Sequence, residues 1–396
     1  MGSFRRKARL WRGMAVALDP ALPSSGRPLR VLIVTDAWYP QVNGVVRTLD
    51  ETRRVLVDLG YEVEVIAPQE AVGPDAADWG RPDFRTLPLP TYPDIRISLL
   101  PKREVARRMK AFAPHAVHIA TEGPLGWAAR SLCIRWGMPF TTSYHTKFPE
   151  YVRARAPIPE AWTYALVRRF HNAGGCTMVT TPSMVEFLEP RGFEHLAAWT
   201  RGVDLAQFDP KFRHAPEGVY AGLERPVWVN VGRVAVEKNL EAFLALDLPG
   251  TKVVVGGGPA LEDLKARYPD ARFTGVKAGD ALARHFADAD VFVFPSLTDT
   301  FGLVIIEAMA CGTPVAAYPV TGPVDIIPGS GAGMVDANLR TACLAALDIS
   351  REAARAHAET YSWEAVGQRF AELLTPDYRP RARERWRRLK GLGARL

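Results

Sequence analysis

The chain has 396 residues, of which 47% are hydrophobic and 23% are charged, and its formal net charge is +7. This length is enough for two domains of ordinary size, and the composition is typical of a folded, soluble protein. Because no run of about 18 apolar residues occurs, we expect no membrane-spanning helix. The four cysteines have neither metal-ligand spacing nor a pairing pattern, so we expect no metal site.

The positive charge is concentrated at the two ends of the chain. Residues 1–13 carry five basic residues and no acid, and residues 376–396 carry a net charge of +6, which leaves −4 for residues 14–375. We therefore separate a basic N-terminal tail, 1–28, and a basic C-terminal extension, 376–396, from the rest of the chain. Solvated ends explain this pattern, and so does attraction to an anionic membrane surface, which we favour. Nothing in the interior of the chain indicates a nucleic-acid partner.

The first large segment, 29–203, alternates short apolar runs with amphipathic stretches, which is typical of a parallel α/β sheet. The predicted strands are 30–36, 61–67, 84–87, 116–119, 140–144 and 177–181. The predicted helices are 45–59, 102–112, 124–136, 159–173 and 183–191.

The same alternation begins again after a linker at about 200–210. The predicted strands are 227–231, 252–256, a short one around 273, 291–294 and one that begins at 315. The predicted helices are 237–247, 259–267, 279–288, an apolar helix after 302, and 363–374, which we expect to close the second domain. The sequence therefore predicts two Rossmann-like domains, 29–203 and 204–375, that face each other across a cleft. Ligands should bind at the carboxyl ends of both sheets.

The segment 290–318 carries the strongest functional pattern. A buried strand ends at Pro295, a polar loop contains Asp299, and Gly302 precedes a helix that carries one acid, Glu307. A helix N-terminus favours an anion, and a glycine lets a phosphate approach the backbone. The two carboxylates could bind a sugar and a ribose on either side of a pyrophosphate. An ordinary crossover with two solvated acids would have the same spacing.

The segment 230–240, NVGRVAVEKNL, places two cations after a strand. Gly232 permits a tight turn, and Arg233 and Lys238 can neutralise a diphosphate, although a solvated loop is the alternative. The segment 253–264 contains a Gly-x-Gly pattern ending at Gly258, but Leu261 occupies the third glycine position. That departure speaks against a dinucleotide-dependent oxidoreductase.

The N-terminal segment offers three candidates of its own. Gly44 precedes the first long helix, where the backbone can approach a ligand. His145 follows a predicted parallel strand; a lone histidine is more often structural, but its position favours a functional role. Glu122 is a weaker candidate at the end of the preceding strand.

The segment 148–172 combines aromatic and basic residues. Tyr151 and Trp162 lie near Arg168 and Arg169, a combination that suits an acceptor at a membrane surface. A core helix with an exposed basic side explains the pattern almost equally well.

Several of these residues together resemble a known family. Asp299, Phe301, Gly302, Glu307, Ala308 and Gly312 are similar to the pattern E-x-F-G-x-x-x-x-E-A-x-x-x-G of family 4 glycosyltransferases, with aspartate in place of the usual first glutamate. The resemblance extends over about 29–375. It implies the GT-B fold, an α/β architecture of two Rossmann-like domains. It also implies transfer of a sugar from a UDP-sugar or a GDP-sugar with retention of anomeric configuration, without a cofactor or a metal ion. In that family the final segment crosses back to the N-terminal domain.

The resemblance also implies roles for individual residues. Arg233 and Lys238 would hold the donor pyrophosphate, and His145 would touch the transferred sugar. Asp299 would bind sugar hydroxyls and Glu307 the ribose. The other residues that the resemblance places at the donor are Gly44, Gly232, Gly258, Val276, Lys277, Phe301, Gly302 and Leu303.

The whole pattern looks most similar to bacterial enzymes that glycosylate diacylglycerol and to the related sulfoquinovosyl and mannosyl transferases. We therefore expect a lipid acceptor and a peripheral location on the cytoplasmic face of the cell membrane. An acceptor in polysaccharide or lipopolysaccharide assembly is the alternative. A nucleotide-sugar epimerase and a non-catalytic binding module are alternatives of other classes, which Arg233, Lys238 and the paired acids disfavour. The sequence leaves the oligomeric state open.

Overall fold

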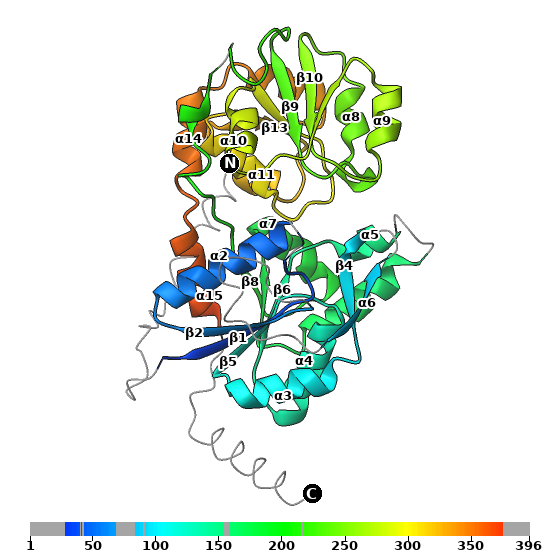
Figure 1. The fold of residues 1–396 in the computed structure, drawn as a ribbon, viewed down its shortest axis with the longest axis vertical. Coiled ribbons are helices and arrows are strands. Elements are labelled where there is room, and N and C mark those ends of the chain that lie inside the picture. Colours follow the sequence, from blue (N-terminus) through cyan, green and yellow to red (C-terminus); the bar gives the residue numbers. More distant parts are fainter. Residues whose placement is uncertain are drawn as a thin grey trace, which may run out of the picture.

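The computed structural model describes residues 28–39, 41, 43–68, 84–89, 92–153, 158–214 and 217–374. It consists of two halves, one above the other in Figure 1, each built on a six-stranded sheet whose paired strands are parallel. The predicted α/β architecture with two Rossmann-like halves is therefore confirmed. The predicted membrane role of the basic ends rests on residues that lie outside the described ranges. No helix in those ranges is long and apolar enough to cross a membrane.

The sheet of the N-terminal half has the strand order β2-β1-β5-β6-β7-β8. Its strands are β1 (Arg30–Val34), β2 (Glu62–Ile66), β5 (Ala116–Ile119), β6 (Thr141–Tyr144), β7 (Cys176–Val179) and β8 (Leu196–Ala198). A separate antiparallel pair consists of β3 (Arg85–Leu89) and β4 (Tyr92–Leu99). The helices of this half are α2 (Gly44–Asp58), α3 (Lys102–Phe112), α4 (Pro124–Trp136), α5 (Phe148–Arg153), α6 (Glu160–His171), α7 (Pro182–Leu188) and the 3₁₀ turn η3 (Glu189–Arg191).

The sheet of the C-terminal half has the order β11-β10-β9-β12-β13-β14. Its strands are β9 (Val227–Val231), β10 (Thr251–Val255), β11 (Arg272–Gly275), β12 (Val291–Phe294), β13 (Val315–Ala317) and β14 (Gly333–Val335). Its helices are α8 (Leu240–Leu244), α9 (Leu261–Arg267), α10 (Gly279–Ala287), α11 (Leu303–Ala310), α12 (Pro323–Ile326), α13 (Leu339–Ala346) and α14 (Arg351–Ala358), with the 3₁₀ turns η4 (Pro210–Phe212) and η5 (Val236–Lys238).

Both sheets have a point at which the strand order reverses. In the C-terminal sheet the chain leaves β9 on one side for β10 and later returns to its other side with β12. In the N-terminal sheet β1 lies in the same way between β2 and β5. Ligands of open parallel sheets bind outside the carboxyl ends of the strands at such points. The loops that follow β1, β5, β9 and β12 are therefore the expected binding region.

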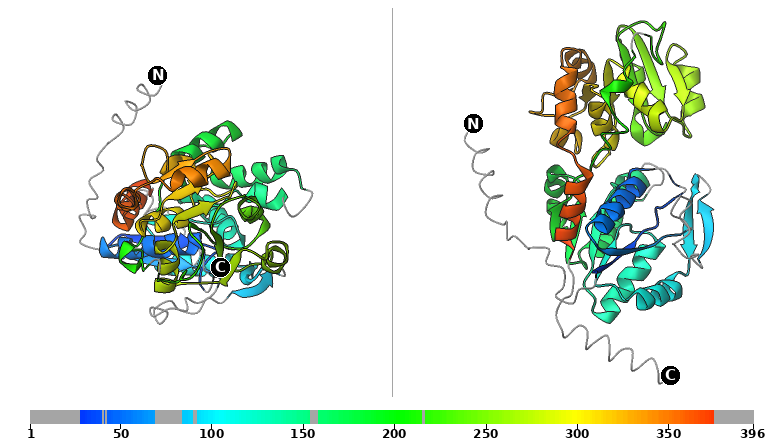
Figure 2. Two further views of the ribbon diagram at one scale, coloured as in Figure 1. Left: turned by 90° about the horizontal axis from the view of Figure 1, so that it is seen from above. Right: turned by 60° about the vertical axis from the view of Figure 1, so that its left-hand side comes forward.

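The last helix, α15 (Trp363–Leu373), corrects the sequence-based division of the chain. It leaves the C-terminal half and lies beside α2 of the N-terminal half, as both views agree (Figures 1 and 2). Trp363, Val366 and Phe370 are buried in the N-terminal core. A side chain at Gly367 would meet the Val55 side chain at 2.3 Å, so the glycine allows the two helices to pack closely. The segment therefore belongs to the N-terminal half, since it buries its apolar face there rather than closing the second domain.

A second difference concerns the helix predicted over 237–247. The structure has the short turn η5, a break, and then the five-residue helix α8. Asn239 adopts the left-handed backbone conformation at the break, with φ of 52°, which no residue of a continuous right-handed helix can adopt. Its side-chain amide donates to the Pro295 carbonyl at 3.0 Å, so the break ties the loop after β9 to the loop after β12.

Candidate active site between the two halves

The loops after β9 and β12 bring together four charged residues, Arg233, Glu237, Lys238 and Asp299. Lys238 Nζ donates to both carboxylate oxygens of Asp299, at 2.6 and 2.9 Å. Arg233 Nη2 donates to Glu237 Oε1 at 2.7 Å. Two predicted cations therefore lie at the switch point of the sheet, each in contact with a carboxylate. Glu237 had not been singled out from the sequence, although it stands next to Lys238.

Asp299 is held in its ionised form by this arrangement. Burial by itself raises the pKa of the carboxyl group, but Lys238, the Ser296 hydroxyl and Arg233 together lower that pKa below its usual value. The carboxylate therefore stays charged at neutral pH and can accept hydrogen bonds from sugar hydroxyls. It is a hydrogen-bond acceptor rather than a proton donor.

Gly302 is the N-cap residue of α11 and has a positive φ of 88°, a conformation that favours glycine. A Cβ atom at this position would lie 2.9 Å from the Phe294 ring and 3.0 Å from Ile305, so packing also excludes a side chain. The glycine thus serves the packing of the helix against the sheet as well as leaving its backbone open. Phe301 is buried in the core beside Tyr361, so its side chain does not face the site.

The starts of two helices meet where the halves face each other. A Cβ on Gly44, the first residue of α2, would lie 3.2 Å from the Leu303 side chain at the start of α11. Asn43 caps α2 by accepting hydrogen bonds from the amides of Val45 and Val46. Both helix ends carry partial positive charge, so their meeting point favours an anionic ligand.

Glu307 forms an ion pair across the two halves. It lies one turn into α11, its side chain is 5% exposed, and its partner is Arg47 of α2. Burial raises the pKa of Glu307 and Arg47 opposes that rise. The Arg47 guanidinium also lies 5.2 Å from the centroid of the Phe208 ring. Arg47 was not predicted from the sequence, although its place one turn after Gly44 was a signal for it.

His145 lies in the loop after β6, and both of its ring nitrogens are hydrogen-bonded. Arg201 Nη2 lies 2.9 Å from Nδ1, and Ser143 Oγ lies 2.7 Å from Nε2. Because arginine only donates, Nδ1 must accept, which places the proton on Nε2. Burial, then Arg201, lowers the pKa of His145 well below its usual value. His145 is therefore a neutral ring of fixed tautomer, and Arg201, which the sequence analysis also missed, fixes it.

Hydrogen bonds hold the His145 loop against the loop of Asp299. Thr300 Oγ1 donates to the His145 carbonyl at 2.6 Å, and Thr180 Oγ1 donates to the Thr300 carbonyl. Ser183, at the start of α7, donates through its amide to Asp325 of α12 at 2.9 Å. The candidate groups of the two halves therefore form one site.

The remaining donor residues predicted from sequence lie along the same edge of the C-terminal sheet. Gly232 follows β9, Gly258 follows β10, and Val276 and Lys277 follow β11. Val276 is 76% exposed, so its side chain is open to a ligand such as a nucleobase. The structure places these residues on the correct edge, and their contact with a donor stays a prediction.

The weaker candidate Glu122 is tied to the N-terminal core. Its carboxylate lies 2.9 Å from Nε2 of His171, a buried residue of α6, and Nδ1 of His171 lies 2.8 Å from Thr142 Oγ1.

Among the described residues, no group of three or more His, Cys, Asp or Glu is arranged to hold a metal ion. That the enzyme needs no metal or cofactor stays a prediction.

The acceptor-side candidates lie on α5 and α6. Trp162 is 73% exposed, Arg168 donates to the Arg191 carbonyl at 2.9 Å, and the Arg169 carbonyl accepts from Arg130 at 2.7 Å. Tyr151 lies in α5, but its side chain is outside the described part of the structure. A core helix whose outer side is only basic does not describe α6 fully, since the Trp162 ring is exposed on the same face.

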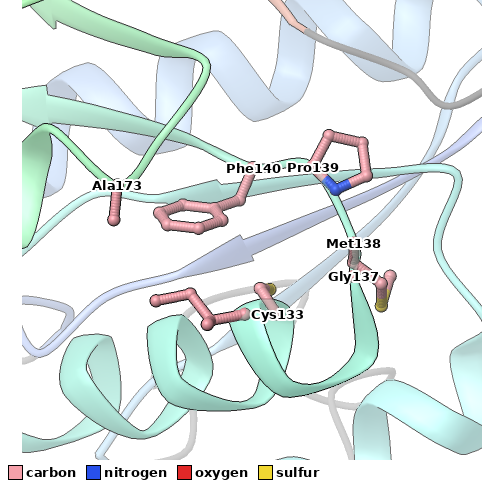
Figure 3. A pocket seen from close by; sticks show the side chains of 7 residues that line it. Cys133, Gly137, Met138, Pro139, Phe140 and Ala173 are labelled. Atoms are coloured by element: carbon pink, nitrogen blue, oxygen red, sulfur yellow. The ribbon is translucent and has the colours of Figure 1, made fainter.

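A separate hollow of about 460 Å³ lies beside the segment that leads into β6 (Figure 3). It is lined by Cys133, Ile134, Gly137, Met138, Pro139, Phe140 and Ala173. Because several of these residues come just before β6, whereas His145 comes just after it, the hollow is at the opposite edge of the sheet. It is therefore not part of the candidate site.

Comparison with known proteins identifies the family. Residues 42–207 match the model named Glycosyltransferase Family 4, and residues 225–356 match Glycosyl transferases group 1. The chain is 30% identical to a sulfoquinovosyl transferase of Arabidopsis thaliana over 89% of this chain and 74% of that protein. It is 31% identical to a GDP-mannose-dependent alpha-mannosyltransferase of Mycobacterium tuberculosis, over 78% and 83% of the two chains.

A third relative, an alpha-monoglucosyldiacylglycerol synthase of Streptococcus pneumoniae, is 28% identical over 73% of this chain and 71% of that protein. Among solved structures, a sucrose-phosphate synthase of Thermosynechococcus elongatus superposes with a TM-score of 0.70 at 21% identity, covering 87% of this chain and 98% of that chain. This likeness supports the fold expected from the sequence. The chain belongs to family 4 of the glycosyltransferases and has the GT-B fold.

Proposed function

We propose that the chain is a retaining glycosyltransferase that moves a hexosyl or uronosyl group from a UDP-sugar or GDP-sugar to a membrane lipid such as diacylglycerol. The observation that carries the proposal is the arrangement of Arg233, Lys238 and Asp299 at the switch point of the C-terminal sheet, opposite His145. Two cations and two helix ends suit a diphosphate, and an ionised carboxylate beside them suits a sugar.

The transfer requires no nucleophilic side chain. The bond between the anomeric carbon and the β-phosphate oxygen breaks while the acceptor oxygen forms its bond to the same carbon on the same face. The acceptor proton passes to an oxygen of the departing phosphate. Arg233 and Lys238 would stabilise the charge that develops on that phosphate, which is the usual source of rate enhancement in such sites. Glu307 would hold the ribose once Arg47 has moved from it.

The neutral state of His145 restricts its role. Since Nδ1 accepts from Arg201 and the proton on Nε2 is directed to Ser143, neither nitrogen is available to transfer a proton. We propose that the ring forms a wall of the sugar site and that the Arg201 contact keeps the wall in place.

An exposed apolar face on the N-terminal half supports a lipid acceptor. Trp162 and Leu166, four residues apart on α6, are 73% and 52% exposed, and Arg169 follows on the same face. Phe148 and Ile158 nearby in the sequence are each 44% exposed. Apolar side chains beside arginine suit the interface of an anionic bilayer, because the rings and aliphatic groups enter it while the guanidinium meets the phosphates. We therefore place the protein on the cytoplasmic face of the cell membrane.

The names of the relatives agree with this substrate class without fixing it. One relative is named for diacylglycerol, which favours the lipid acceptor. Another is named for GDP-mannose, so mannosyl transfer, including transfer in polysaccharide or lipopolysaccharide assembly, is the second candidate.

Two measurements test the proposal. Flotation with vesicles containing anionic lipid should fall for the double variant Trp162→Ser/Leu166→Ser, while the control Leu347→Ser, which removes a residue 40% exposed on the other half, should float like the parent. Equal flotation of both variants would contradict membrane contact through α6.

NMR of the product should show the anomeric configuration of the donor, and the opposite configuration would refute retention.

A further inference from the structure

Lys147 occupies an unusual position in the candidate site. It lies in the loop between β6 and α5, two residues after His145, and is 6% exposed. Lysine is rarely buried to this extent without an acidic partner, because its ammonium loses hydration.

Within the described residues, the Lys147 ammonium makes neither a hydrogen bond nor an ion pair. Its ammonium lies 4.6 Å from the centroid of the Phe187 ring. The acid in its own segment, Glu150, is engaged elsewhere: Oε1 accepts from the Tyr164 hydroxyl at 2.6 Å, and Oε2 is buried without a partner. The Lys147 side chain is therefore largely buried, and its ammonium has no hydrogen-bond or ion-pair partner among the described residues, so it can bind an anion.

Its neighbours place this ammonium beside the sugar end of the site. Burial lowers the pKa of Lys147 and the charge of Arg191 lowers it further, whereas the charges of Glu150 and of Asp299, the predicted sugar-binding residue, raise it. The hydrogen bond from Thr300 to the His145 carbonyl holds the Lys147 loop against the Asp299 loop. A flat membrane surface can meet little of a side chain that is 6% exposed, so we consider a bound substrate as the source of the anion.

We propose that Lys147 binds an oxyanion carried by one of the two substrates and so selects an anionic substrate over its neutral analogue. The inference rests on the proposed function. The oxyanion is a carboxylate or sulfonate on the transferred sugar, or a phosphate on the acceptor next to the reacting hydroxyl. The place of Lys147 beside Asp299 favours the sugar, and the two sources are separated by experiment.

The first arm of the test varies the donor. UDP-glucuronate and UDP-glucose share a nucleotide and differ in one carboxylate, so the ratio of their kcat/KM values reports on that charge. For Lys147→Met the ratio should fall about 10- to 100-fold relative to the parent, the range expected for a charge-assisted hydrogen bond. Lys147→Arg should keep most of the preference. Lys265→Met removes an exposed lysine of α9 and should leave the ratio unchanged.

The second arm varies the acceptor at constant donor. Diacylglycerol and phosphatidylglycerol are compared in neutral detergent micelles, so that the headgroup phosphate is the relevant difference. If Lys147→Met lowers only the ratio of kcat/KM for phosphatidylglycerol to kcat/KM for diacylglycerol, the oxyanion belongs to the acceptor. If Lys147→Met lowers the ratio between the two donors, the oxyanion belongs to the sugar. Both results support the proposal. Lys147→Met could instead lower kcat/KM by the same factor for every substrate and lower the melting temperature, with Glu150→Gln giving the same result. Lys147 would then be a structural partner of Glu150, and the proposal would be overturned.

Unchanged ratios in both arms would overturn the proposal as well. So would a parent enzyme that uses only neutral donors and neutral acceptors, although that result would leave the glycosyltransferase function intact. A parent that releases no nucleotide from any donor would instead contradict the proposed function itself.

Discussion

Replacing Lys238 by methionine is the most informative single change in the donor site. The ammonium contacts both oxygens of Asp299, and the two side chains are 24% and 18% exposed, so the pair is better shielded than a surface ion pair. If Lys238 also holds the departing diphosphate, its loss should remove about 2–4 kcal/mol of transition-state stabilisation, or roughly 30- to 900-fold in kcat/KM. Steady-state nucleotide release measures this loss directly.

A second variant separates the two possible roles of this lysine. Lys238→Met leaves the Asp299 carboxylate buried without its main counter-charge, which could by itself impair the enzyme. The double variant Lys238→Met/Asp299→Asn removes both charges. It should remain at least as impaired as Lys238→Met if the lysine acts on the diphosphate. Recovery of activity in the double variant, or near-normal kcat/KM in the single one, would refute the reasoning; melting curves confirm that each variant is folded.

Three further predictions concern Glu307, Arg47 and His145. Glu307→Gln should weaken binding of the bare nucleoside diphosphate, measured by calorimetry, more than Asp299→Asn does; equal losses would contradict the assigned ribose and sugar roles. Arg47→Met should reduce the free energy of unfolding by roughly 1–3 kcal/mol, because it leaves Glu307 buried and without its partner, and the melting temperature should fall accordingly; Arg47→Met/Glu307→Gln should recover most of the loss. The pKa of His145 in the folded protein lies well below 6.5. As the pH falls below that value, the unfolded chain therefore binds a proton that the folded protein does not, and the free energy of unfolding decreases. In NMR titrations the pKa of His145 should be higher in Arg201→Met than in the parent, and the variant should lose less stability at low pH. An unchanged titration would exclude the positioning role of the arginine.

The parts of the structure that could be predicted are those determined by local sequence. The strand at Val291–Phe294 and the helix after Gly302 follow from an apolar run, a glycine and a return to apolar periodicity, and both occur at the expected positions. The cations after β9 were predicted because their distance from a strand end is a local property. The break at Asn239 was not, since nothing in the sequence shows that its side chain bonds to Pro295.

Contacts between the halves could not be predicted. Arg47 and Glu307 are 260 residues apart, and their pairing depends on how the two sheets face each other. The contact of Arg201 with His145 lies within the N-terminal half, but the residues are 56 apart in the sequence and no local pattern shows that they meet. The place of α15 could not be predicted either, because its apolar face fits either half until the packing is known. Burial was equally hidden: Lys147 reads as an ordinary loop lysine, and only the three-dimensional packing shows that it is enclosed.

The activity that we propose for this site is transfer of a sugar from a nucleoside diphosphate donor to a lipid. Nucleotide release from a panel of UDP- and GDP-sugars, each with and without diacylglycerol, measures it. We expect that at least one donor releases its nucleotide faster when the lipid is present, with the sugar recovered in the lipid fraction. Release of nucleotide that is unaffected by lipid across the whole panel, or interconversion of the donor without any transfer, would contradict it.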